Sequence, residues 1–174
     1  MGGRGNRQTS NHVRLLEMES LRNGTNRTAI VPSQASDQCQ RDRPQRGAEG
    51  VITCCGAFYA GWSLYVKNGK PIFRYTCFEI ADITIADADQ IPEKNVTIST
   101  EFIPERSREG RGTLNLSVNG KIVGEGVLKR SLFRHCLEPF EVGRDSITSV
   151  DPTYKDKGEF AFTGRIEKNT FALE

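Results

Sequence analysis

Residues 62–75 read WSLYVKNGKPIFRY, and the pair Asn68-Gly69 divides this stretch into two runs of β-favouring residues. Asn-Gly tolerates the positive φ angles of a two-residue type I′ hairpin turn, so the stretch predicts two antiparallel strands. Counting outward from the turn gives the register. One face carries Val66 with Pro71, Leu64 with Phe73 and Trp62 with Tyr75, and the other carries Ser63 with Arg74 and Lys67 with Lys70. Because the apolar face is continuous and needs a second layer to cover it, the hairpin predicts a sheet packed on a sheet.

The rest of the chain repeats this pattern of short strands and tight turns. Apolar or alternating runs predict strands at residues 50–57, 78–85, 96–102, 140–142 and 160–173. A second hairpin is predicted over residues 113–128 with its turn at Asn119-Gly120, and its register places Val118 opposite Lys121 and Leu116 opposite Val123. Residues 146–158 are predicted to form a surface loop. The expected fold class is therefore all-β, an antiparallel β-sandwich of the jelly-roll or concanavalin-like type.

The first 48 residues differ in composition from the remainder. They contain eight arginines, no lysine and four acidic residues, a net charge of +4 within a chain whose formal net charge is +2. We expect residues 1–48 to be an arginine-rich leader and linker, partly disordered, with one possible strand at 28–31, and residues 49–174 to form the sandwich domain. The arginines are scattered and no aromatic residue lies among them, so no nucleic-acid partner is expected.

The sequence contains no recognisable membrane or export segment. No run approaches the roughly 20 apolar residues that a membrane helix requires. The opening residues, MGGRGNR, lack the apolar region of an export signal. We therefore expect no membrane association, and as written the chain is expected to stay in the cytoplasm.

Five cysteines cannot all pair within one chain, and they are Cys39, Cys54, Cys55, Cys77 and Cys136. Cys54 and Cys55 are adjacent, so on a strand their side chains point to opposite faces. No C-x-x-C pair is present to begin a zinc site. We interpret the cysteines as reduced, mostly buried thiols. The alternative is a single bridge from Cys54 or Cys55 to Cys77.

Three further patterns resemble functional sites, but ordinary structure explains each of them better. His135 lies beside Cys136, yet neighbours on a strand face opposite ways and do not form a nucleophile pair. The acids Asp82, Asp87 and Asp89 lack the spacing of a calcium-binding loop. Sequons for N-glycosylation occur at Asn23, Asn26, Asn95 and Asn115. The residues therefore predict no catalytic group, no metal site and no cofactor.

Five segments in order carry a resemblance to a known family. They are GAEGVIT at 47–53, GWSLYVKNGKPIFRY at 61–75, TLNLSVNGK at 113–121, FEVGRD at 140–145 and FAFTGRIEK at 160–168. Together they resemble the C-terminal β-sandwich region of large bacterial arylsulfatases. In sulfatases a Cys or Ser of a C/S-x-P-x-R motif is oxidised to formylglycine in a separate catalytic domain. The nearest match here, CQRDR at 39–43, has arginine where the motif has proline. The resemblance thus implies a noncatalytic fragment without the active site.

The resemblance leads to our first functional hypothesis, which is an accessory domain. Such a domain would have a sulfatase catalytic domain as its partner, and the loop around Arg144 and Asp145 is the candidate contact surface. If the sandwich evolved against a partner domain, the isolated chain would expose an apolar patch and self-associate.

The alternative hypothesis is an independent β-sandwich module that binds carbohydrate or another ligand. Carbohydrate sites usually present exposed aromatic side chains. The hairpin register assigns Trp62, Phe73 and Tyr75 to the core. The aromatic residues left for a sugar are therefore Tyr59, Tyr65 and Tyr154.

Overall fold

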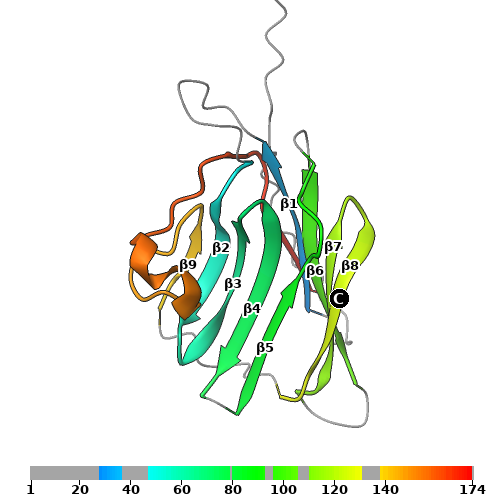
Figure 1. The fold of residues 1–174 in the computed structure, drawn as a ribbon. Coiled ribbons are helices and arrows are strands. Elements are labelled where there is room, and N and C mark those ends of the chain that lie inside the picture. The colour runs from blue at the N-terminus through cyan, green and yellow to red at the C-terminus, as the bar shows by residue number, and fades with distance from the viewer. Residues whose placement is uncertain are drawn as a thin grey trace, which may run out of the picture.

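The computed structural model describes residues 28–36, 47–78, 80–92, 96–105, 110–130 and 138–173. These residues form two antiparallel sheets that pack face to face, as Figure 1 shows. The five-stranded sheet has the order β5 (Ala81–Ala86), β4 (Lys70–Cys77), β3 (Ala60–Lys67), β2 (Gly50–Ala57) and β9 (Phe140–Val142). The six-stranded sheet has the order β10 (Arg165–Ile166), β1 (Thr28–Ser36), β6 (Val96–Pro104), β7 (Gly112–Val118) and β8 (Lys121–Leu128), and β11 (Thr170–Leu173) also pairs with β1. The predicted β-sandwich is confirmed.

The first hairpin has the predicted register in every pair. Trp62 pairs with Tyr75, Leu64 with Phe73 and Val66 with Pro71. Asn68 and Gly69 have φ angles of 54° and 74°, as the type I′ turn requires. Strands β3 and β4 are thereby aligned so that alternate side chains point into the sandwich and out from it.

The second hairpin turns where predicted, at Asn119-Gly120, and Val118 pairs with Lys121 as predicted, but the predicted register farther from the turn is wrong. A register shift between Leu116 and Ser117 places Leu116 opposite Gly124 instead of Val123. Strand β8 has a β-bulge, in which one extra residue of β8 lies opposite the other strand, so counting residues from the turn gives the wrong partner beyond it. It also presents Gly124 to strand β5, where a Cβ atom would lie 2.5 Å from Ile85 Cγ2.

The sandwich core lies between the two sheets. Leu64 and Phe73 on the five-stranded sheet are at most 2% exposed, and they face Ile98 and Leu116, which are fully buried on the other sheet. Trp62, whose placement in the core was predicted, packs at the margin. Its ring lies 6.0 Å from that of Phe140 and 5.9 Å from that of Phe171, which closes the sandwich between β9 and β11. Burial of these side chains is the main source of stability.

A second apolar cluster lies on the outer face of the five-stranded sheet, and it corrects the prediction of a surface loop at 146–158. This segment contains the 3₁₀ helix η1 (Pro152–Lys157), which lies against the sheet beside β9 in Figure 1. Val150 and Tyr154 are fully buried there, against Tyr65 and Phe160. The sequence did not predict this packing, because the segment is mostly polar and only two of its side chains, Val150 and Tyr154, are anchored in the cluster.

Strand β1 extends the sandwich toward the N-terminus. The possible strand at 28–31 is present and continues to Ser36, and it pairs with β6 through Ala29 with Glu101 and Ala35 with Val96. The six-stranded sheet therefore includes residues before position 49, in the region assigned to the leader and linker. The disorder expected of the leader falls on residues 1–27 and 37–46, which lie outside the described residues. No helix among the described residues is long and apolar enough to cross a membrane.

Candidate functional site

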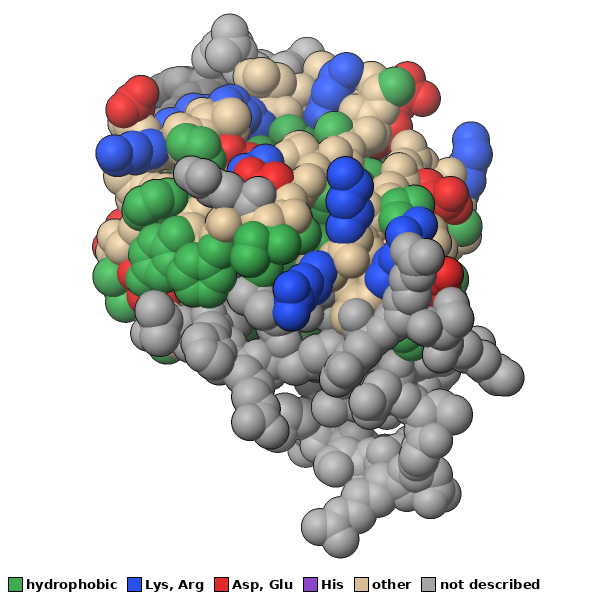
Figure 2. Space-filling model, turned by 90° about the horizontal axis from the view of Figure 1, so that it is seen from below, with side chains coloured by type: hydrophobic (Ala, Val, Ile, Leu, Met, Phe, Trp, Pro, Cys, Tyr) green, Lys and Arg blue, Asp and Glu red, His purple; other side chains and the backbone are tan. Residues whose placement is uncertain are grey.

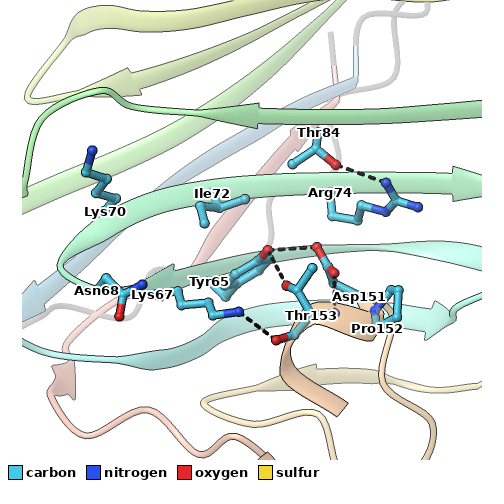
Figure 3. Close-up of a pocket in the computed structure, with 10 residues that line it drawn as sticks. All are labelled: Tyr65, Lys67, Asn68, Lys70, Ile72, Arg74, Thr84, Asp151, Pro152 and Thr153. Carbon is cyan, nitrogen blue, oxygen red and sulfur yellow. Dashed lines mark hydrogen bonds between the residues drawn. The ribbon is translucent and has the colours of Figure 1, made fainter. Parts of the chain in front are cut away.

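A pocket of about 530 Å³ lies on the outer face of the five-stranded sheet, where η1 leaves the sheet uncovered. Strand alternation explains its lining. Because Leu64, Val66 and Phe73 point into the core, their neighbours Tyr65 and Ile72 point outward and form the floor. The complete lining is Tyr65, Lys67, Asn68, Lys70, Ile72, Arg74, Thr84, Asp151, Pro152 and Thr153 (Figure 3). The volume lies in the range of about 300–1,000 Å³ that is typical of small-molecule sites.

Hydrogen bonds join the start of η1 to strand β3 and hold one wall of the pocket in place. The hydroxyl group of Tyr65 donates to Asp151 Oδ2 at 2.7 Å, and Asp151 Oδ1 accepts from Thr153 N at 2.8 Å. Lys67 Nζ donates to the carbonyl oxygen of Thr153 at 2.6 Å. Burial raises the pKa of Tyr65 above its ordinary value, so its hydroxyl group stays protonated near neutral pH. This wall is therefore formed before any ligand arrives.

The guanidinium group of Arg74 forms the opposite wall. Its Nη1 donates to Thr84 Oγ1 at 3.0 Å, and its Nη2 lies 2.7 Å from Asp82 Oδ2 in an ion pair. The side chain of Arg74 is 19% exposed, which restricts its orientation. A guanidinium group has five N–H donors, and these two contacts leave donors for a further acceptor.

The lining carries a surplus of positive charge. It contains three cationic residues, Lys67, Lys70 and Arg74, and one acidic residue, Asp151, which already accepts hydrogen bonds from Tyr65 and Thr153. Among the described residues the Lys70 side chain has no hydrogen-bond or ion-pair partner, and in Figure 3 it lies at the end of the pocket away from Asp151. The pocket is thus suited to a ligand with a negative charge and hydroxyl groups.

The residues proposed as a contact loop, Arg144 and Asp145, lie in different environments. Asp145 is only 3% exposed, and its Oδ2 accepts hydrogen bonds from Tyr154 at 2.6 Å and from the amide of Val150 at 2.9 Å. Arg144 is on the surface, with its side chain 56% exposed and Glu159 at 3.6 Å. Asp145 thus anchors the 146–158 segment, and a contact role for this loop stays a prediction that would rest on Arg144.

One group of metal-binding side chains occurs among the described residues, and sequence reasoning did not identify it. Ligand atoms of Cys54, Glu141 and Asp145 lie within 4.8 Å of one another. Each already has hydrogen-bond partners. Cys54 Sγ donates to the carbonyl oxygen of Arg144 at 3.4 Å, and Glu141 accepts from the amide and hydroxyl groups of Ser146 at 2.6 Å each. Burial raises the pKa of the Cys54 thiol well above its ordinary value. These contacts account for the cluster as a structural one.

The other candidates from the sequence are not brought together in a site. Asp82 pairs with Arg74, and Asp87 Oδ1 accepts from the amide of Asp89 at 2.9 Å, so among the described residues these acids form no group of three that could hold a metal ion. The thiols of Cys54, Cys55 and Cys77 are free, so the alternative of a bridge between them is wrong. Asn115 is buried within β7, where a glycan would not fit. The other candidates lie outside the described residues, namely Cys39, Cys136, His12, His135, Asn23, Asn26 and Asn95.

The prediction for the aromatic residues left to a sugar is wrong for two of the three. Tyr154 is fully buried and Tyr65 is 1% exposed, so neither presents its ring on the surface. Tyr65 still belongs to the pocket floor. The signal for the pocket was present in the hairpin register, which places Arg74 and Lys67 on the outward face. The contribution of residues 151–153 had no sequence signal, because they lie far along the chain.

Comparisons with known proteins identify a similar fold but no family. No family model matches the sequence, and no curated protein matches it. Among solved structures, the CBM40 module of the Ruminococcus gnavus IT-sialidase in complex with α2,3-sialyllactose is similar, with a TM-score of 0.51 and 13% identity over 82% of this chain and 72% of that chain. The same module with α2,6-sialyllactose has a TM-score of 0.49 and 12% identity, over 82% and 74% of the two chains. At this identity the likeness concerns the fold alone.

These comparisons overturn the resemblance to arylsulfatases and with it the hypothesis of a sulfatase accessory domain. The solved structure with a TM-score of 0.51 is a sialidase carbohydrate-binding module, and nothing in the comparisons supports a sulfatase domain. The segments that carried the resemblance explain the error. Two of them surround Asn-Gly hairpin turns, and such turns recur in unrelated antiparallel sandwiches because they match the strand twist. The segments therefore indicate an antiparallel β-sandwich and not membership of the sulfatase family.

Proposed function

We propose that this chain is a noncatalytic module that binds an anionic carbohydrate in the pocket on the outer face of its five-stranded sheet. The observation that carries the proposal is the lining itself, which places Lys67, Lys70 and Arg74 around a floor whose accessible apolar surface is that of Ile72. A sugar ring presents apolar C–H groups to such a floor and hydroxyl groups to the rim. A carboxylate on the sugar would accept hydrogen bonds from the cationic side chains.

The similar fold supports the same class of ligand. The Ruminococcus gnavus module is in complex with α2,3-sialyllactose, a trisaccharide whose sialic acid bears a carboxylate. A surplus of cationic residues around a pocket is what a ligand of this charge requires. We therefore take a terminal acidic sugar as the ligand class for this chain.

The composition of the lining supports a binding role rather than a catalytic one. Glycoside hydrolysis ordinarily uses a pair of carboxyl groups on either side of the scissile bond. The ten described lining residues include one carboxylate, Asp151, and it is 3% exposed and bonded to Tyr65. The lining thus lacks the second group that the reaction needs.

Titration calorimetry on the full chain tests the proposal. We expect binding of α2,3-sialyllactose and at least about tenfold weaker binding of lactose, which lacks the carboxylate. Arg74→Gln should weaken binding of the acidic sugar by about tenfold, whereas Arg165→Gln, which removes an exposed arginine from β10, should not. Equal affinity for the two sugars would refute an anionic ligand, and no heat with either would refute the pocket as a site for sialylated glycans.

A further inference from the structure

One end of the sandwich carries a patch of exposed apolar side chains that the pocket does not explain. We call it the tip patch, and it consists of Phe58 and Tyr59 in the β2–β3 turn and Phe78 and Ile80 in the β4–β5 turn. Phe58 is 57% exposed, Phe78 is 45% exposed and Ile80 is 58% exposed. Figure 2 views the molecule from this end and shows hydrophobic side chains gathered beside lysine and arginine side chains. Exposed apolar groups that form a contiguous patch commonly mark a contact surface.

The two turns of the tip patch are fixed to each other. The amide of Phe78 donates to the carbonyl oxygen of Tyr59 at 2.5 Å, and Thr76 Oγ1 donates to the carbonyl oxygen of Phe58 at 2.9 Å. The amide of Ile80 donates to the carbonyl oxygen of Cys77 at 2.8 Å. These backbone groups thus have partners within the protein and can leave water without losing hydrogen bonds.

The backbone of Phe78 is held in an unfavourable conformation that presents its ring. Its φ angle is 46°, in the left-handed region where large side chains are uncommon. The ring is nevertheless exposed, with its centroid 6.1 Å from that of Tyr59. Core packing therefore does not account for an aromatic residue at this position.

Basic residues flank the tip patch. Strands β8 and β5 run past each other in opposite directions, because Gly124 lies against Ile85 and Gly126 lies against Ile83. Following β8 beyond Gly126 therefore leads to the β4–β5 turn, and Lys129 and Arg130 lie beside that turn. Burial raises the pKa of Cys77, and the positive charge of Arg130 opposes this, which agrees with that placement. Both basic residues are exposed. The described acid nearest this turn, Asp82, is neutralised by its ion pair with Arg74 at 2.7 Å, so the charges of Lys129 and Arg130 remain for a partner.

We propose that the tip patch attaches the chain to an anionic lipid bilayer, with the aromatic and aliphatic side chains entering the interface and Lys129 and Arg130 contacting the headgroups. Projecting apolar side chains with adjacent cations are what peripheral insertion requires. A second copy of the chain fits less well. An aromatic side chain offers roughly 200 Å², of which about half is exposed in Phe58 and in Phe78 and less in Tyr59, so the tip patch falls well short of the about 800 Å² per partner of a stable interface. The expectation of no membrane association, drawn from the absence of a spanning segment, did not address this mode.

Co-sedimentation of the full chain with vesicles tests the proposal. We expect binding to phosphatidylcholine vesicles that contain about 30% phosphatidylserine, and much weaker binding to phosphatidylcholine alone or at high salt. The double variant Phe58→Ser, Phe78→Asn should lose at least about tenfold in vesicle affinity, and its fold should persist because asparagine tolerates the backbone of position 78. Ile147→Ser removes an apolar side chain that is 62% exposed elsewhere and should bind as the wild type does. Arg74→Gln should also bind vesicles normally, which separates this proposal from the glycan pocket.

Three results would overturn the proposal. They are equal vesicle binding by the wild type and the double variant, no binding to anionic vesicles at low salt, and a concentration-dependent dimer that the double variant abolishes. The last result would assign the tip patch to a second copy of the chain. If the double variant melts early, Lys129→Glu with Arg130→Glu takes its place, because these substitutions lie at exposed positions. Loss of vesicle binding by that variant supports the proposal, and retained binding contradicts it.

Discussion

Tyr154 donates a hydrogen bond of 2.6 Å from its hydroxyl group to Oδ2 of Asp145, and both residues are almost completely buried. Nine residues apart in sequence, they join the beginning of the 146–158 segment to η1. The same hydroxyl group lies 3.1 Å from Ser63 Oγ on strand β3. This contact fixes the segment that supplies Asp151 and Thr153 to the pocket, so the pocket wall depends on a tyrosine that does not line it.

Removing the Tyr154 hydroxyl group should destabilise the protein. Tyr154→Phe leaves the buried oxygens of Asp145 and Ser63 with one partner fewer, so we expect a loss of about 1–3 kcal/mol in the free energy of unfolding. Urea denaturation measures it. Tyr59→Phe is the matched control, because the Tyr59 hydroxyl group has no hydrogen bond among the described residues. Equal stability of the two variants would contradict the role assigned to the buried contact.

The stability contributed by Asp145 should depend on pH. Burial raises the pKa of its carboxyl group above the ordinary value of 3.8, and the charge of Glu141 acts in the same direction. A group that binds its proton more tightly when folded stabilises most below its unfolded pKa, and this contribution is lost as pH rises through the folded pKa. Relative to Asp145→Asn, the wild type should therefore lose stability as pH increases from about 3 to 7. Urea unfolding at several pH values measures this, and an increase over that range would be evidence against a raised pKa.

The close approach of β8 to β5 should make Gly126 sensitive to substitution. A Cβ atom at this position would lie 2.3 Å from Ile83 Cδ1. Gly126→Val should destabilise by about 1–3 kcal/mol or more, and Ile83→Ala in the same chain should restore part of the loss by vacating the space. Gly47→Ala is the control, since nothing lies within 4 Å of its added atom. Thermal unfolding reports the comparison, and additive losses in the double variant would exclude the predicted clash.

The ion pair between Arg74 and Asp82 should compete with an anionic ligand. Asp82 Oδ2 lies 2.7 Å from Arg74 Nη2, and Asp82 itself does not line the pocket. Asp82→Asn should therefore raise the affinity for α2,3-sialyllactose roughly fivefold, which corresponds to about 1 kcal/mol. Glu125→Gln removes an exposed acid from β8 on the other sheet and should leave the affinity unchanged. Weaker binding by the Asp82 variant would mean that the acid positions Arg74 for the ligand instead of competing for it.

The parts of the fold that local chemistry determines could be predicted, and the parts that depend on distant contacts could not. Asn68-Gly69 and Asn119-Gly120 each specify a turn from two residues, and the first also specifies a register. The bulge leaves Val123 of β8 without a ladder partner and places Gly124 against Ile85 of the other sheet. The burial of Tyr154 depends on a carboxylate and a hydroxyl group that face it across the outer surface. Neither relationship has a periodic sequence signal.

The candidate site follows the same division. Alternation along residues 62–75 places Lys67 and Arg74 on the outward face, so half of the pocket was implied by the hairpin. The wall formed by Asp151 and Thr153 could not be inferred, because it is set by the contact of Tyr65 with Asp151 across 86 positions of the sequence. Resemblance of segments misled for a related reason. Residues that form an Asn-Gly hairpin indicate the local backbone structure, but they do not indicate which ligand the folded protein binds.

Amide chemical-shift mapping during titration with α2,3-sialyllactose tests the central claim most directly, because it locates the ligand on the chain. We predict that the largest shifts occur at the amides of residues 67–70 and 72–74, of Thr84 and of Asp151 and Thr153, and that lactose produces much smaller shifts at the same amides. Shifts confined to other parts of the sandwich, or none at ligand concentrations in the millimolar range, would contradict the assignment of this pocket as a site for acidic glycans.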